Sequence, residues 1–422
     1  MKKIVLLMVL LALAAILGAP ASGGPAAGSY IVVLEKSVSL DAVLVQHESL
    51  AGVEVDHTYR HALNGYAARL TPQALASVRS DPRVAFVSPD RLVRTTAQTL
   101  PTGINRIDGD VSSTRSGDGT GSVNVNVAVV DTGIDSTHPD LNVVGGHGCA
   151  PGIGTLDGNG HGSHVSGTIA AKDDANGVVG VVPGARLYAV KVLSDAGVGL
   201  TSDIVCGIDW VTSTRTDLDP TNNIAVANMS LGGGGSDDGN CGRSNGDAEH
   251  LAICNSVAAG VTYVVAAGND GVDYRSFTPA AYDEVLTVTA LADFNGQPGG
   301  GAASTCRTDT DDQYASFSNY ATLAADQNHT IAAPGVCIYS TYMLGMYNTL
   351  SGTSMASPHM TGTVALCIAT GACTGTPSQV IARMRSDAQA YNQANPGYGF
   401  NGDPGHPVGG RYYGYLTRAG AY

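Results

Sequence analysis

The stretch VNVAVVDTG at residues 125–133 decides the fold, because a run rich in β-branched residues ends in an aspartate and a glycine turn. Similar apolar runs follow at 186–192, 224–229, 261–265 and 285–289. Helical stretches are expected between them, at 162–171, 202–213 and 247–259. Short strands that alternate with helices favour an α/β fold with a mainly parallel sheet. In such a sheet, functional side chains gather at the carboxyl ends of the strands.

A compositionally separate unit precedes this region, from Ser29 to about Arg94. Strands are expected at 30–34, 65–70 and 84–87. Thr71 followed by Pro72 indicates a helix start, with a threonine cap and proline at the first helical position, and the helix should run to Ser80. We expect a small α+β domain here, and then a polar linker at 95–99.

The first residues have the layout of a secretory signal peptide. Lys2 and Lys3 precede an apolar run at 4–17, and Ala19-Pro20-Ala21 offers a cleavage site of small residues. The run is short for a membrane span, although an uncleaved anchor is the alternative. We expect a signal peptide at residues 1–21 and a secreted protein that has no membrane contact after cleavage.

Composition and charge narrow the class of protein. The chain has 422 residues, of which 43% are apolar, 14% are charged and 55 are glycine, as expected for a compact protein rich in turns. The formal net charge of -14 argues against nucleic acid as a partner, because an acidic surface repels phosphate. The acidic excess serves solubility in one interpretation, and gathers around calcium in another.

Eight cysteines fit an exported protein, because disulfides persist outside the reducing cytosol, and none lies before residue 149. Sequence alone does not determine the connectivity. We favour the local pairs Cys241–Cys254, Cys306–Cys337 and Cys367–Cys373, which leaves Cys149–Cys206. A zinc site is the competing interpretation, but no paired CxxC or HxxxH spacing supports it.

Three local motifs place a reactive side chain at the end of a strand or the start of a helix. Asp131 ends the first strand, His161 opens a helix of small residues, and Ser354 begins a helix with Pro358 in its first turn. Each motif alone also fits an ordinary turn, loop or cap. Together they provide a serine nucleophile, a histidine base that accepts its proton and an aspartate that orients the histidine.

The order Asp131, His161, Ser354 is that of subtilisin, and the sequence resembles the subtilisin-like serine proteases, or subtilases. The resemblance covers residues 97–422 as a catalytic domain, and residues 29–96 resemble the family's inhibitory prosegment. It implies a three-layer α/β domain with a mainly parallel sheet, preceded by a small α+β prodomain. The implied protein is a secreted serine endopeptidase that processes itself from a zymogen.

By the same resemblance, Asp131, His161 and Ser354 match the family's acid, base and nucleophile. Asn269, in the segment VAAGN at 265–269, matches the residue that stabilises the oxyanion, and the Ser354 backbone N–H is the second donor. Ser163 stands where many members have threonine, so the hydroxyl is kept.

Two further segments resemble the walls of the substrate cleft. One resembles the edge strand that pairs with an extended substrate and includes Ser230, Leu231, Gly232 and Gly233. The other resembles a wall of the pocket for the residue before the scissile bond and comprises Ala266, Ala267 and Gly268. Small side chains would leave this pocket open, so a broad preference for protein and peptide substrates is expected of a monomeric enzyme.

The polar loop at 172–178 resembles the family's high-affinity calcium loop, although alone it also fits an ordinary helix-ending loop. The resemblance implies side-chain oxygens from Gln98, Asp140 and Asp174, and backbone carbonyls from Lys172, Asn176 and Val178. No organic cofactor is expected. The segment from Ala97 to Pro101 resembles a mature N-terminus, so self-cleavage is expected near Thr96–Ala97, with the prosegment retained as an inhibitor.

Two other functions remain as alternatives. A serine esterase would need a G-x-S-x-G motif followed by its acid and histidine, whereas here the serine comes last. A catalytically silent binding protein with the same fold would not need an intact triad, an oxyanion asparagine and a prosegment.

Overall fold

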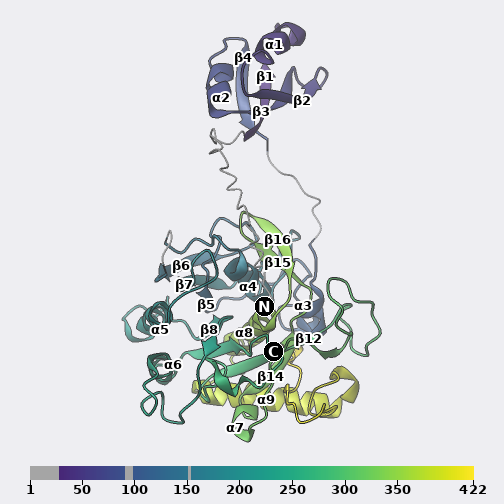
Figure 1. Ribbon diagram of the computed structural model, residues 1–422. Coiled ribbons are helices and arrows are strands. Elements are labelled where there is room, and N and C mark those ends of the chain that lie inside the picture. Colours follow the sequence, from purple (N-terminus) through teal and green to yellow (C-terminus); the bar gives the residue numbers. More distant parts are fainter. Residues whose placement is uncertain (1–27, 91–97, 151–153) are drawn as a thin grey trace, which may run out of the picture. The chain divides into compact units, whose positions relative to one another are not determined.

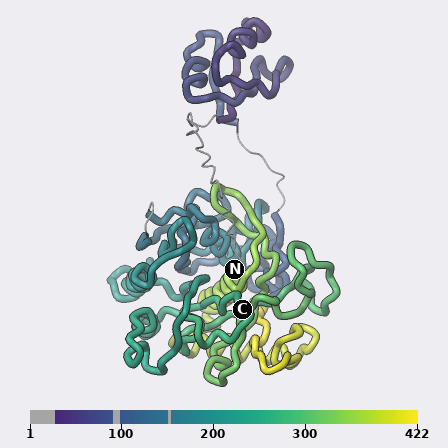
Figure 2. Tube along the Cα trace, viewed as in Figure 1, coloured from purple at the N-terminus to yellow at the C-terminus, as the bar shows by residue number. Residues whose placement is uncertain are grey.

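The computed structural model describes residues 28–90, 98–150 and 154–422. The chain divides into two compact units, residues 1–95 and 96–422 (Figures 1 and 2). The predicted signal peptide at 1–21 and the predicted cleavage point between Thr96 and Ala97 lie outside the described residues. In the described ranges, no helix is both long enough and apolar enough to cross a membrane.

The smaller unit contains an antiparallel sheet of four strands in the order β2-β3-β1-β4. The strands are β1 (Gly28–Leu34), β2 (Val53–Tyr59), β3 (Gly65–Leu70) and β4 (Val84–Pro89). The helices are α1 (Leu40–His47) and α2 (Pro72–Arg79). The predicted strands and helix are confirmed, and α1 and β2 are additions that the sequence analysis missed.

Both helices cover one face of this sheet. Val32 and Leu34 alternate along β1, and they share one buried cluster with Val43 of α1 and Val78 of α2. Thr71 caps α2 as predicted, because its hydroxyl accepts the Ala74 N–H at 3.3 Å and Pro72 takes the first helical position. The unit therefore has its own hydrophobic core.

The larger unit is built on an eight-stranded sheet in the order β13-β12-β10-β8-β5-β7-β6, with β14 also pairing with β12. All these pairs are parallel except β12–β13. The strands are β5 (Asn126–Asp131), β6 (Val143–Gly148), β7 (Arg186–Lys191), β8 (Val226–Met229), β10 (Thr262–Ala266), β12 (Leu286–Ala292), β13 (Gln313–Tyr314) and β14 (Thr330–Pro334).

Helices cover both faces of this sheet (Figure 1). Successive side chains of β5 belong alternately to two buried cores, one on each face. Val127 and Val129 share a core with residues of α4 (His161–Ala170), α8 (Thr353–Ala369) and α9 (Pro377–Ala394). Ala128 and Val130 share another with residues of α5 (Thr201–Thr216) and α6 (Ala248–Ala258). The predicted three-layer α/β fold with a mainly parallel sheet is confirmed.

Shorter elements complete the larger unit. They are two short helices, α3 (Thr102–Arg106) and α7 (Ala324–Gln327), a two-stranded pair of β9 (Gly233–Gly234) with β11 (Phe277–Thr278), a hairpin of β15 (Ile338–Tyr342) with β16 (Met346–Leu350), and 3-10 turns at Gly109–Val111, Tyr274–Ser276, Pro396–Tyr398 and Ala419–Ala421.

All four favoured disulfides are present: Cys149–Cys206, Cys241–Cys254, Cys306–Cys337 and Cys367–Cys373. No cysteine is therefore left to bind zinc among the described residues.

Candidate active site

Asp131 and His161 form a direct contact at the carboxyl end of β5. The two residues meet through His161 Nδ1 and Asp131 Oδ1, which lie 2.8 Å apart. Asp131 is fully buried, whereas 27% of the His161 side chain is exposed. The carboxylate therefore fixes the His161 ring through Nδ1. The other ring nitrogen, Nε2, is left to accept a proton from a nucleophile.

A second carboxylate, Asp157, holds His161 at the start of α4. Its Oδ2 accepts the Ser163 N–H at 2.8 Å and the Ser163 hydroxyl at 2.6 Å. Its Oδ1 accepts the Gly160 N–H at 2.8 Å and the Thr132 hydroxyl at 2.9 Å. These bonds tie the first turn of α4 to the loop that follows β5.

The close approach of these two segments requires glycine at position 162. A methyl group there would lie 2.1 Å from the Gly133 carbonyl oxygen. In the GHG sequence around His161, Gly162 is therefore required for the close packing of these two segments.

The charge of the site favours the protonated form of His161. Burial by itself would lower the pKa of His161, but the charge and hydrogen bond of Asp131, together with the charge of Asp157, raise it above the ordinary value. Two other buried histidines differ, since burial lowers the pKa of His164 to about 3 and that of His359 to about 4. Both are bonded to backbone carbonyls and have structural roles.

Ser354 is the second residue of α8. The prediction that Pro358 lies in the first turn of this helix is wrong. Pro358 is in the interior of α8 and not in its first turn. Because proline has no N–H, it cannot bond to the Ser354 carbonyl four residues earlier, and the Ser230 hydroxyl donates to that carbonyl instead, at 2.9 Å. The Ser354 hydroxyl donates to the Ser230 carbonyl at 3.3 Å.

The Asn269 side chain and the Ser354 backbone N–H lie close to each other beside Gly352. The Asn269 side-chain oxygen accepts the Thr353 N–H at 2.8 Å and the Thr353 hydroxyl at 3.0 Å, which leaves Nδ2 as the outward donor. A methyl group placed on Gly352 would lie 3.6 Å from Asn269 Nδ2, Asn269 Oδ1 and Ser354 N. Two donors as close together as Nδ2 and the Ser354 N–H can stabilise a developing oxyanion.

A cleft of about 370 Å³ brings His161 together with Ser230, Leu231 and Gly232. Its other apolar wall residues are Leu193, Val198 and Ile204. Of the predicted edge strand at 230–233, Gly233 lies in β9, and residues 230–232 have no strand partner within the described part of the chain. A sheet edge has no ladder of hydrogen bonds until another chain pairs with it.

The predicted open pocket beside Ala266, Ala267 and Gly268 is also corrected. The Phe277 ring packs between two glycine backbones: a methyl group on Gly232 would lie 2.5 Å from its Cε1, and one on Gly268 would lie 3.1 Å from its Cδ1. Ala266 and Ala267 are buried in and just after β10. The aromatic ring therefore fills space that the small side chains alone would leave empty.

The structure brings the predicted calcium ligands to one place. Gln98 Nε2 lies 2.8 Å from the Lys172 carbonyl oxygen, 3.4 Å from that of Asn176 and 3.3 Å from that of Val178. Burial raises the pKa of Asp140 to about 7, and the charge of nearby Asp174 also raises it. Two buried oxygens at this place, Gln98 Oε1 and Asp140 Oδ1, have no hydrogen-bond partner.

The oxygen set fits calcium, because that ion prefers several carbonyl and carboxylate oxygens. Asp174 is the outermost member, since it is exposed and accepts the Asn176 N–H at 3.2 Å.

Sequence reasoning missed three residues of the site: Asp157, Phe277 and Thr353. Asp157 had a readable signal, because the segment DGNGH at 157–161 places a carboxylate one turn before the predicted base. Phe277 and Thr353 had none, since their roles depend on contacts between segments far apart in the chain.

The chain is similar to known protein families and to individual proteins. The model of the subtilase family matches residues 122–401, and that of the peptidase inhibitor I9 family matches residues 29–96. Subtilisin amylosacchariticus from Bacillus subtilis subsp. amylosacchariticus is 37% identical over 366 residues, which cover 85% of this chain and 84% of that protein. Subtilisin DY from Bacillus licheniformis is 40% identical over 296 residues, which cover 69% of this chain and 92% of that protein.

A solved structure also resembles the chain. It is a cold adapted subtilisin-like serine proteinase with a TM-score of 0.53 and 26% sequence identity, and the match covers 77% of this chain and 99% of that one.

Proposed function

The chain belongs to the subtilase family of serine endopeptidases and carries an inhibitor-type prosegment, and from this premise we propose that it is a secreted, self-processing enzyme whose triad is Asp131, His161 and Ser354. The observation that supports this most strongly is the 2.8 Å contact between His161 and buried Asp131. The nearness of Asn269 Nδ2 to the Ser354 N–H adds to it.

The proposed chemistry is acyl transfer to Ser354. His161 takes the hydroxyl proton as Ser354 Oγ attacks the peptide carbonyl, and Asp131 stabilises the resulting imidazolium. Asn269 Nδ2 and the Ser354 N–H bind the oxyanion of the tetrahedral intermediate. His161 then protonates the leaving amine, and water hydrolyses the acyl-enzyme by the same route in reverse.

The cleft supports binding of an extended peptide along Ser230, Leu231 and Gly232. Apolar Leu193, Val198 and Ile204 also line it, which favours apolar residues in the bound peptide. Phe277 fills the adjoining pocket between Gly232 and Gly268, so we expect a preference for small residues immediately before the scissile bond.

The proposed maturation divides the chain into a signal peptide at 1–21, a prosegment at 29–96 and a catalytic domain at 97–422. Cleavage between Thr96 and Ala97 would present threonine, a small residue, to the pocket that Phe277 restricts. The prosegment would act as chaperone and inhibitor of its own catalytic domain, a monomer that acts on proteins and peptides.

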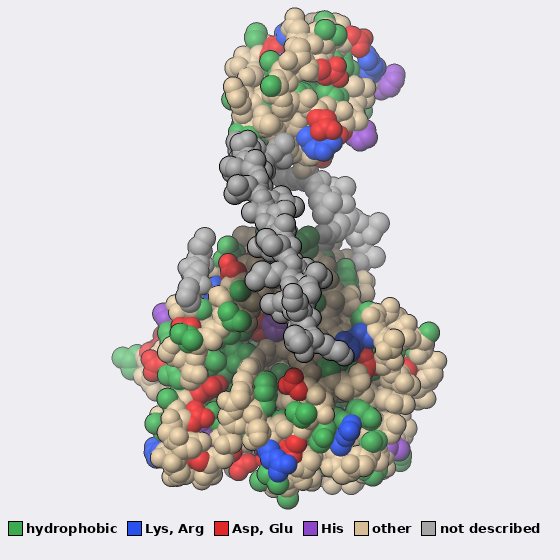
Figure 3. All heavy atoms as spheres, viewed as in Figure 1, with side chains coloured by type: hydrophobic (Ala, Val, Ile, Leu, Met, Phe, Trp, Pro, Cys, Tyr) green, Lys and Arg blue, Asp and Glu red, His purple; other side chains and the backbone are tan. Residues whose placement is uncertain are grey.

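Charge and chemistry also bear on partners and cofactors. Acidic and basic side chains are scattered over the visible face of the larger unit, without a broad basic patch there, so nothing on this face favours nucleic acid (Figure 3). We propose one structural calcium ion, held by Gln98, Asp140 and Asp174 side chains and by the carbonyls of Lys172, Asn176 and Val178. The ion would supply no step of the reaction and would tie the loop at 172–178 to Gln98.

Labelling with a fluorophosphonate, which reacts only with an activated serine, tests the triad against a silent binding protein. We expect wild type to be labelled once, on Ser354, and the Ser354→Ala and His161→Ala variants to remain unlabelled. Absence of labelling in folded, processed wild type would support a binding protein instead.

A further inference from the structure

Three acidic or imidazole side chains outside the candidate active site meet at the amino ends of β12 and β14. Asp283 precedes β12, Asp326 belongs to α7, and His329 directly precedes β14. One ring nitrogen of His329 and one carboxylate oxygen from each aspartate lie within 4.8 Å of one another. Because β12 and β14 are parallel, this edge of the sheet is opposite to the carboxyl end that carries Asp131.

The tautomer of His329 leaves a lone pair directed into this cluster. The Thr287 hydroxyl donates its single proton to the Ala280 carbonyl at 2.7 Å, so it can only accept from His329 Nδ1, 3.3 Å away. The proton is therefore on Nδ1, and Nε2 has no hydrogen-bond partner although His329 is only 2% exposed. A histidine whose far nitrogen is fixed in this way is prepared to bind a metal.

One of the two carboxylates near that lone pair is not satisfied either. Asp326 is 5% exposed, and its Oδ2 has no hydrogen-bond partner. Asp283 Oδ1 lies 3.7 Å from His329 Nε2. Three groups that can only accept thus lie close together. Water reaches Asp283, whose side chain is 54% exposed, but the buried His329 Nε2 and Asp326 Oδ2 are unfavourable without a cation or a proton between them.

The pKa values of His329 and Asp326 are consistent with buried groups that have no hydrogen-bond partner. Burial lowers the pKa of His329 to about 4, and the charge of Arg385 adds to the effect. Burial raises the pKa of Asp326 to about 6, and the charges of Asp273 and Asp283 add to that rise. Arg385 is held by the carbonyls of Gln327 and Thr330 and not by these carboxylates, so it does not neutralise them by contact.

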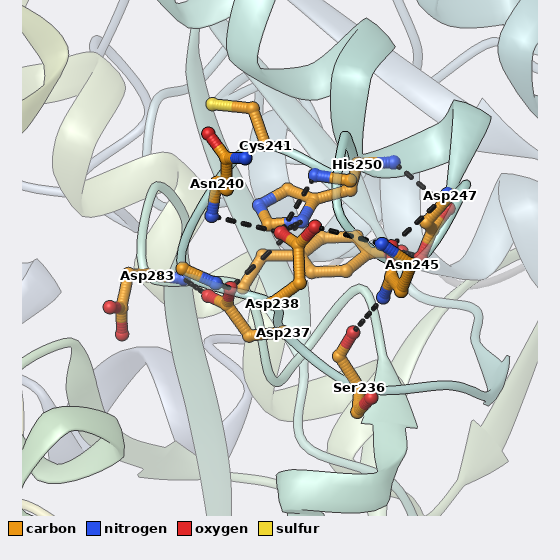
Figure 4. A network of polar contacts seen from close by, with 12 residues as sticks. Ser236, Asp237, Asp238, Asn240, Cys241, Asn245, Asp247, His250 and Asp283 are labelled. Atoms are coloured by element: carbon orange, nitrogen blue, oxygen red, sulfur yellow. Dashed lines mark hydrogen bonds and ion pairs between the residues drawn. The ribbon is translucent and has the colours of Figure 1, made fainter.

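A neighbouring cluster of Asp237, Asp238 and His250 provides the contrast (Figure 4). Each oxygen of Asp238 accepts two backbone N–H groups, from residues 240, 242, 244 and 245. His250 Nε2 lies 2.9 Å from Glu284 Oε2, whereas Nδ1 lies 3.6 Å from Asp238 Oδ1 and has no hydrogen-bond partner. In this cluster the backbone satisfies the Asp238 carboxylate, whereas Asp326 Oδ2 in the other cluster has no hydrogen-bond partner.

We propose that Asp283, Asp326 and His329 bind a divalent transition-metal ion of the zinc type. One imidazole nitrogen and two carboxylate oxygens are typical zinc ligands, whereas calcium prefers oxygen alone. Ligands of a tetrahedral zinc ion lie about 3.3 Å apart, given metal–ligand distances of about 2.0–2.2 Å, so small side-chain movements would close the site.

Asp283 and His329 line an open cavity of about 430 Å³, from which water can supply the fourth ligand. The bound ion would join α7 to the loop before β12 and so stabilise this edge of the sheet.

The test uses full-length protein with Ser354→Ala, which cannot digest itself and makes the result independent of the proposed catalytic mechanism. The protein is stripped with a chelator, returned to calcium, and titrated with ZnCl₂ by calorimetry and with Co²⁺ by absorption spectroscopy. We expect one site, a visible Co²⁺ spectrum and a higher midpoint of thermal unfolding with zinc.

Three variants and one control assign the site. Asp326→Asn and His329→Gln should each abolish the site, and Thr287→Val should weaken binding by about 10–100-fold through loss of the bond that orients His329. His406→Gln, which removes a half-exposed histidine paired with Asp403, should leave binding unchanged.

Thermal unfolding without zinc checks that each variant is folded. The proposal is overturned if folded parent protein binds no zinc, or if binding survives Asp326→Asn and His329→Gln.

Discussion

At the scale of single residues, His161 is the group whose surroundings set the chemistry. It must be neutral to accept the Ser354 proton, and its pKa lies above the ordinary value because Asp131 and Asp157 outweigh burial. Activity should therefore rise with pH through a midpoint above that of an unperturbed histidine.

Asp131→Asn tests this electrostatic balance. It removes the main charge that raises the pKa of His161, so the acid limb of the kcat/KM profile should move to lower pH. The value of kcat/KM should also fall, by about 10⁴-fold if the loss matches that measured for the corresponding change in a trypsin-like enzyme. A pH profile with a chromogenic peptide is the measurement, and an acid limb that does not move would contradict the account.

Phe277 should control the residue accepted before the scissile bond. Phe277→Ala opens the space between Gly232 and Gly268, and burial of an aromatic substrate side chain there contributes about 1.5–3 kcal/mol, or roughly 10–100-fold in kcat/KM. The check compares two peptides that differ only by alanine or phenylalanine at that position. Val272→Ala, at a residue that is 49% exposed, is the control. An unchanged preference would show that Phe277 does not line the pocket.

At the scale of elements, the loop at 172–178 is held by Gln98, and calcium should add to this restraint. At about 100 times its dissociation constant, a bound ion adds about 2.7 kcal/mol to the free energy of unfolding. Chelation should lower the midpoint of thermal unfolding of Ser354→Ala protein, and Gln98→Ala should remove most of that calcium dependence. Asp219→Asn, in an exposed turn, should keep it. Equal calcium dependence in all three proteins would argue against this site.

Element prediction succeeded where the local pattern was strong. The β-branched run at 125–130 predicted strand β5, and Thr71-Pro72 predicted the start of helix α2. β6 was missed because half of VVGGHG is glycine, which strands disfavour. α9 was missed although the sequence carries its start: Thr376 and Gln379 form a capping box, and Pro377 takes the first helical position.

The same distinction holds for the site. Asp131, His161 and Ser354 are each marked by a local motif, and so is Asn269. The place of Pro358 was mispredicted because the missing hydrogen bond is replaced by Ser230, a contact between distant segments. The pocket was mispredicted for the same reason, since nothing near Gly232 or Gly268 in the chain indicates that Phe277 lies between them.

At the scale of the whole molecule, the smaller unit has its own core, formed by α1, α2, β1 and β3. A unit with a closed core should keep its fold when it is separated. We expect residues 29–96, added as a separate polypeptide, to inhibit peptide hydrolysis by the processed enzyme in competition with substrate. Replacement of buried Val32 by Asp should unfold the unit and abolish the inhibition. No inhibition by the folded wild-type unit would contradict its proposed role.

The most direct test of the central claim is casein hydrolysis by the purified secreted protein beside its Ser354→Ala variant, with the intact mass of both. We expect wild type to digest casein and to begin at Ala97, and the variant to be inert and to retain its prosegment. A folded and processed wild type that cuts neither casein nor a peptide library, or a variant that still matures by itself, would contradict the account.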